Sequence, residues 1–77
     1  MIIDIDEFPA GYQLKPGEWL CSHDYEAFIV HAESAAQAAE LTAEYCDADS
    51  EDSSRVKVGD QEYLVEGRRK YTARKVR

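Results

Sequence analysis

The fold of this chain is decided by residues 25–46, which read YEAFIVHAESAAQAAELTAEYC. The first part alternates, because Phe28 and every second residue after it would lie on one face of a strand. The second part begins with Ser34 three residues before Gln37, which is the spacing of a helix capping box, and an alanine-rich run follows. The stretch therefore predicts a strand that leads into a helix over residues 35–46.

The predicted helix has an apolar face that would pack against a sheet, because small and apolar residues recur in it every three or four positions. Small alanine side chains also allow a helix to lie close to the strands below it. The residues assigned to this inward face are Ala35, Ala38, Leu41, Thr42 and Tyr45.

Short strand patterns precede this stretch. Residues 2–5 read IIDI and predict a short strand or an anchored arm. Residues 12–14 and 18–21 flank Pro16 and Gly17, the residue types that a type II turn requires at its two central positions. These two segments are therefore predicted to form a hairpin.

More strand patterns follow the helix. Residues 55–58 and 61–66 are separated only by Gly59 and Asp60, a connection that suits a tight hairpin. Residues 70–76 alternate once more, so the order of elements is roughly β-β-β-α-β-β-β. We expect an α+β fold with one helix packed on a small antiparallel sheet.

The length of 77 residues is enough for one domain, residues 1–77, with one modest core, and the chain is expected to be a monomer or a homodimer. An acidic loop is expected over residues 47–54 and a basic hairpin or strand over residues 61–77. No basic segment followed by an apolar run stands near the first residues, so the interpretation is a cytoplasmic protein that does not enter a membrane.

Charge is distributed very unevenly. Residues 1–54 carry thirteen Asp and Glu against Lys15 alone, whereas residues 55–77 carry three acids and eight Lys and Arg. The net charge is −7. Repulsion among the excess negative charges opposes the compact state, so the uneven charge distribution suggests a role in function.

The helix and the loop after it would present one polar and mostly acidic ridge, because spacings of three or four keep its residues on one helix face. These spacings connect Glu33, Gln37, Glu40, Glu44, Asp47 and Glu51. Four helical residues rise about 6 Å, the scale of neighbouring phosphates in a nucleic acid strand, so the ridge could imitate such a backbone. A solvated face that serves only solubility is the alternative. The predicted ridge comprises Glu33, Glu40, Glu44, Asp47, Asp49, Glu51 and Asp52.

The basic segment supports a competing hypothesis, in which Lys and Arg beside an aromatic residue contact nucleic acid phosphates. The negative net charge opposes this hypothesis, and charged side chains also protect terminal edge strands from unwanted pairing. The residues of this alternative site are Arg68, Arg69, Lys70, Tyr71, Arg74 and Lys75.

No enzyme signature, cofactor motif or metal motif is present. Cys21, His23 and Asp24 resemble part of a catalytic set only weakly, and both cysteines are expected to be thiols. Whether Cys21 and His23 approach His31 and Cys46 is open at this point, although the four do not have the usual short spacings of zinc ligands. Any Tyr or Trp left exposed beside carboxylates would suit a protein interface.

The chain resembles anti-CRISPR proteins, small inhibitors that phages direct against host defence. The resemblance lies in the general plan: a tiny acidic domain, a strand through Phe28, Ile29 and Val30, and a capped helix from Ser34. It implies a protein of the host cytoplasm that occupies a basic nucleic-acid-binding surface of a CRISPR effector subunit and blocks DNA binding without chemistry. The alternative function is a nucleic-acid-binding or accessory protein.

Overall fold

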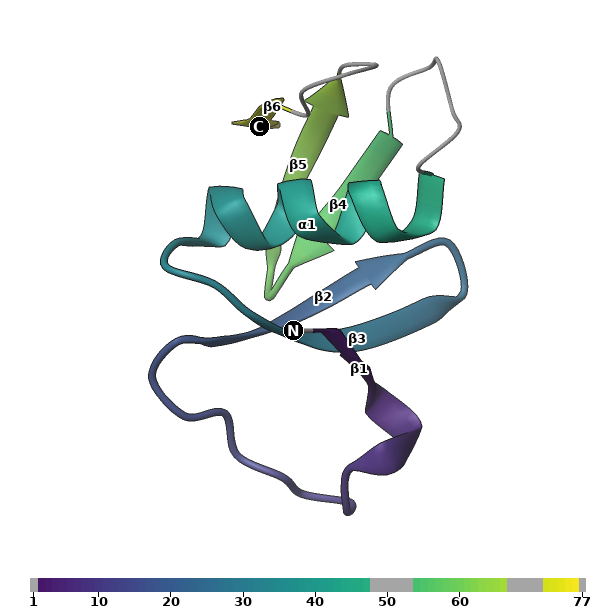
Figure 1. The fold of residues 1–77 in the computed structure, drawn as a ribbon, viewed down its shortest axis with the longest axis vertical. Helices are drawn as coiled ribbons and strands as arrows, with labels where there is room; N and C mark the ends of the chain where they lie inside the picture. Colours follow the sequence, from purple (N-terminus) through teal and green to yellow (C-terminus); the bar gives the residue numbers. More distant parts are fainter. Residues whose placement is uncertain (1, 48–53, 67–71, 77) are drawn as a thin grey trace.

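The computed structural model describes residues 2–47, 54–66 and 72–76. One helix lies across one face of a six-stranded antiparallel sheet, which confirms the α+β class (Figure 1). The helix is α1 (Ala35–Asp47), and a short 3-10 helix, η1 (Ile5–Glu7), follows the first strand. The strands are β1 (Ile2–Asp4), β2 (Glu18–His23), β3 (Glu26–His31), β4 (Ser54–Val58), β5 (Gln61–Glu66) and β6 (Thr72–Lys75).

The strand order of the sheet is β1-β3-β2-β4-β5-β6. Its middle consists of two hairpins, β2–β3 and β4–β5. The β4–β5 hairpin turns through Gly59 and Asp60 as predicted, with a φ of +59° at Gly59 that favours glycine. The hairpins join where β2 pairs with β4, with Cys21 opposite Val58, and the amide of Gly59 donates to the carbonyl of Leu20 at 2.9 Å.

The predicted hairpin between residues 12–14 and 18–21 is wrong in one half. The turn itself forms: the amide of Glu18 donates to the carbonyl of Lys15 at 2.9 Å, and Gly17 has a φ of +85°. Residues 12–14 form no strand. The segment is held by a side chain of β2 instead, because the Tyr12 hydroxyl and the Lys15 amide both donate to the Glu18 carboxylate.

The start of α1 confirms the predicted capping. The hydroxyl of Ser34 accepts from the amide of Gln37 at 3.1 Å, and the side chain of Gln37 accepts from the amide of Glu33 at 2.6 Å. Both bonds satisfy backbone donors that a helix start leaves open, so these two side chains fix where α1 begins.

The core lies between α1 and the sheet. Ala38 and Thr42 are buried as expected, but Tyr45 is 64% exposed, and Ala39 and Ala43 are fully buried in its place. The buried face of α1 is therefore rotated about the helix axis relative to the predicted one, toward Ala39 and Ala43 and away from Tyr45. The smallest side chains face the sheet because its core side is filled by larger ones: Phe28, Val30, Val56, Val58, Tyr63 and Val65.

The opposite face of the sheet is covered beside β3. Ile29 points away from the helix side and is 1% exposed, and η1 contacts β3. Glu18 holds the loop that follows η1. Its carboxylate accepts from the Tyr12 hydroxyl at 2.7 Å and from the Lys15 amide at 2.9 Å, and its second oxygen lies 3.2 Å from Nε2 of His31.

Glu18 should make stability depend on pH. The Lys15 amide, followed by the Tyr12 hydroxyl, lowers the pKa of Glu18 from its ordinary 4.5. A carboxyl group whose pKa falls on folding stabilises the native state above its unfolded pKa, and this stabilisation is lost as pH falls through the lower folded pKa. Between neutral and strongly acidic pH, the free energy of unfolding measured with urea should therefore fall more for the unaltered protein than for Glu18→Gln. An equal fall for both proteins would contradict this role of Glu18. Glu7→Gln is the control, because it removes an exposed carboxylate and should behave like the unaltered protein.

Candidate functional site

Glu33 and Glu44 of the predicted ridge are exposed, Glu33 just before α1 and Glu44 in its last turn. Nothing along α1 compensates their charge, because the helix contains no Lys or Arg. The ion pairs found among the described residues are His23–Asp24, His31–Glu18, Arg55–Glu62 and Arg74–Glu66, and none includes Glu33 or Glu44. Both carboxylates are exposed, and neither has an ion-pair partner among the residues that the structure describes.

Glu40 has a different environment from these two. It is half-buried, and its Oε2 accepts from the backbone amide of Ala73 at 2.8 Å. Ala73 belongs to β6, which ends the sheet and pairs with β5 alone. Glu40 therefore fastens α1 to the edge strand, and its hydrogen-bonding capacity is partly used inside the protein.

Removing this carboxylate should destabilise the fold modestly. Glu40→Ala leaves a partly buried amide of β6 without its acceptor, which costs about 1 kcal/mol. Urea unfolding followed by circular dichroism would measure the change, with Glu44→Ala as a control that removes the same groups from an exposed position of the same helix. Equal stability of the two variants would contradict the structural role of Glu40.

The remaining ridge residues are placed only in part. Asp47 is the last residue of α1 and Ser54 the first of β4, so these two ends of the predicted acidic loop lie within elements. Asp49, Glu51 and Asp52 lie outside the described residues.

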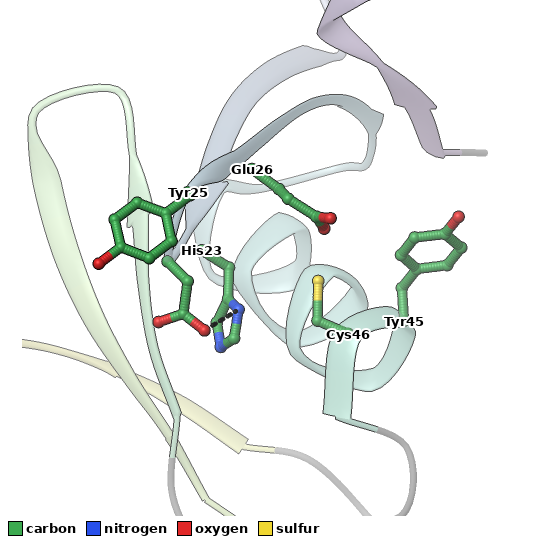
Figure 2. Close-up of a pocket in the computed structure, with 6 residues that line it drawn as sticks. His23, Tyr25, Glu26, Tyr45 and Cys46 are labelled. Carbon is green, nitrogen blue, oxygen red and sulfur yellow. Dashed lines mark ion pairs between the residues drawn. The ribbon is translucent and has the colours of Figure 1, made fainter.

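A hollow of about 560 Å³ opens beside the C-terminal end of α1 (Figure 2). The turn between β2 and β3 supplies one side and the last turn of α1 the other. Tyr25 is fully exposed, and Asp24 has a side chain that is 78% exposed. The lining residues are His23, Asp24, Tyr25, Glu26, Tyr45 and Cys46.

Local chemistry explains this turn. Asp24 has a φ of +54°, a left-handed conformation that Asp tolerates better than most residues. His23 and Glu26 pair across the strands, which leaves Asp24 and Tyr25 at the tip. Nδ1 of His23 also lies 3.5 Å from Oδ2 of Asp24. This hairpin was not predicted from the sequence, because its tip contains neither Gly nor Pro, the usual signals of a turn.

The possible catalytic and metal-binding groups come together only in part, because His23 and Cys46 line the hollow whereas Cys21 and His31 do not. Cys21 is fully buried, and burial raises the pKa of its thiol, whereas a nucleophilic cysteine needs a lowered pKa. Cys21 and His23 share the helix side of β2, while His31 lies on the other face beside Glu18. Within the described ranges no three His, Cys, Asp or Glu side chains gather as a metal site. Neither cysteine is part of a disulfide.

The alternative basic site is described at two positions. Arg74 and Lys75 are exposed on β6, and Nη2 of Arg74 lies 3.4 Å from Oε1 of Glu66. Arg68, Arg69, Lys70 and Tyr71 lie outside the described residues. The structure thus brings together one basic residue and an acid, which moderates the positive charge at that point.

Comparison with known proteins does not assign this chain to a family. No protein-family model, curated protein or solved structure matches it. In the part of the chain that the structure describes, no helix has the length and apolar character needed to cross a membrane.

Proposed function

We propose that this chain is a non-enzymatic binding protein that contacts a basic surface of another protein. The contacting region is the acidic surface, defined as Glu33 and Glu44 of the α1 side together with Asp24 and Glu26 beside the hollow. The observation that carries the proposal is the lack of any Lys or Arg on α1 or in an ion pair with Glu33 or Glu44 among the described residues.

The placement of Glu44 supports binding over stability. A carboxylate in the last turn of a helix faces the negative end of the helix dipole, where a cation would be favourable. Glu44 therefore gives the isolated fold no local gain. A basic partner would supply the missing positive charge and would also be steered toward the surface by it.

The exposed tyrosines suit the same role. Tyr25 and Tyr45 present large aromatic surfaces next to carboxylates, and aromatic side chains are enriched among the residues that dominate binding energy at interfaces. We propose further, on the resemblance to anti-CRISPR proteins, that the basic surface is the nucleic-acid-binding surface of a CRISPR effector. The protein would then exclude DNA by occupancy, without a reaction.

The proposal can be tested with a defined polycation. Deca-lysine and a short DNA duplex would each be titrated into the protein at low and high salt by isothermal calorimetry. We expect deca-lysine to bind at low salt and its affinity to fall at high salt. The DNA duplex should not bind. Binding of the duplex but not of deca-lysine would overturn the proposal and favour the alternative function through Arg74, Lys75 and the residues before them.

A further inference from the structure

The hollow beside α1 combines aromatic rings with a carboxylate that the fold does not use. In Figure 2, Tyr25 and Tyr45 flank the hollow, and the carboxylate of Glu26 lies between them in that view. Glu26 is exposed and takes part in no ion pair found among the described residues. Asp24 adds a second carboxylate, which is already 3.5 Å from His23.

The two rings differ in what they already contact. Tyr45 packs edge-on against Phe28, with ring centroids 5.5 Å apart, so the protein itself fixes its position. Tyr25 is fully exposed at the tip of the hairpin, so the faces of its ring are open to a ligand. One ring is thus anchored by the core and the other is presented to solvent on the far side of the hollow.

We propose that this hollow receives an arginine side chain of the basic partner, an inference that rests on the proposed function. A guanidinium group is planar, so it can stack on a tyrosine ring while its N–H groups pair with a carboxylate such as Glu26. A lysine ammonium is a strongly hydrated point charge that cannot make both contacts in the same way. The volume of about 560 Å³ is ample for one such group.

A preference for deca-arginine over deca-lysine would distinguish binding in this hollow from general attraction of the acidic surface to positive charge. Deca-arginine and deca-lysine carry the same charge, so the acidic surface alone would bind them about equally. Stacking and paired hydrogen bonds should make deca-arginine bind about tenfold more tightly to the unaltered protein. Calorimetric titration of both peptides at one salt concentration would measure this ratio.

Variants assign the preference to the hollow. Tyr25→Ala and Glu26→Gln should each reduce the ratio toward one, whereas Tyr25→Phe keeps the ring and should keep the ratio. Because Tyr25 is fully exposed, its truncation opens no cavity, and circular dichroism would verify that each variant is folded.

The outcomes distinguish this inference from the proposed function. Equal affinity of the unaltered protein for both peptides would overturn the arginine site and leave the proposed function standing. An arginine preference that persists in Tyr25→Ala and in Glu26→Gln would also overturn it. If neither peptide binds, the proposed function is overturned together with the site.

Discussion

Replacing Glu33 and Glu44 with lysine is expected to weaken binding of deca-lysine roughly thirtyfold. An exposed ion pair contributes about 0.5 kcal/mol, and reversal replaces that attraction with a repulsion of similar size. Each position therefore changes the binding free energy by about 1 kcal/mol, and the two together by about 2 kcal/mol, which is roughly thirtyfold. The fold should be retained because both side chains are exposed, and a lysine at position 44 suits the end of α1. Calorimetric titration of Glu33→Lys/Glu44→Lys would measure the change.

A matched control separates local contact from net charge. Asp6 and Glu7 are exposed in η1, which Figure 1 shows on the part of the molecule away from α1. Reversing both changes the net charge from −7 to −3, as reversing Glu33 and Glu44 does, since each substitution adds two charges. Screening limits the long-range effect, so Asp6→Lys/Glu7→Lys should bind within about threefold of the unaltered protein. Equal weakening by both variants would contradict a local acidic surface.

Enlarging Ala39 is expected to destabilise the protein more than any surface change considered above. Ala39 is fully buried where α1 meets the sheet, and its neighbours on the strands are tightly packed. Leucine would push α1 from the sheet or force strained side chains, which costs about 2–3 kcal/mol. Since a domain of this size has little more than about 5 kcal/mol of total stability, Ala39→Leu should melt roughly 10–15 °C lower.

Thermal unfolding by circular dichroism would test this packing. Glu44→Leu is the control, because it introduces the same side chain on the same helix at an exposed position and should leave the melting temperature nearly unchanged. Equal melting of Ala39→Leu and Glu44→Leu would contradict the observed orientation of α1. A lower melting temperature for Glu44→Leu alone would contradict both the observed and the predicted orientation, because neither buries Glu44.

Features set by neighbouring residues were predictable. The capping of α1 by Ser34 and Gln37, the Pro16-Gly17 turn and the Gly59-Asp60 hairpin each depend on a few adjacent residues, and all three form. The orientation of α1 was harder, because alanines occur on several sides of the helix. Periodicity alone therefore did not distinguish the face with Ala39 and Ala43 from the face with Tyr45.

Features that join distant residues were not predictable. β2 pairs with β3 along its length and with β4 at Cys21 and Ser22, and no local signal in the sequence sets these partners. The bond from Ala73 to Glu40 links residues 33 positions apart, so the ridge looked uniform in the sequence. The exposure of Glu33 and Glu44 followed from helical spacing, but the hollow depended on a turn at Asp24 that carries no Gly or Pro.

Mapping where a polycation binds would show whether the acidic surface is the contacting region. A nitrogen-15-labelled sample would be titrated with deca-lysine, and amide shift changes would be followed along the chain by NMR. We predict that, among the described residues, the changes concentrate at Asp24 to Glu26, at Glu33 and around Glu44. Changes concentrated at η1, or spread evenly over the surface, would contradict it.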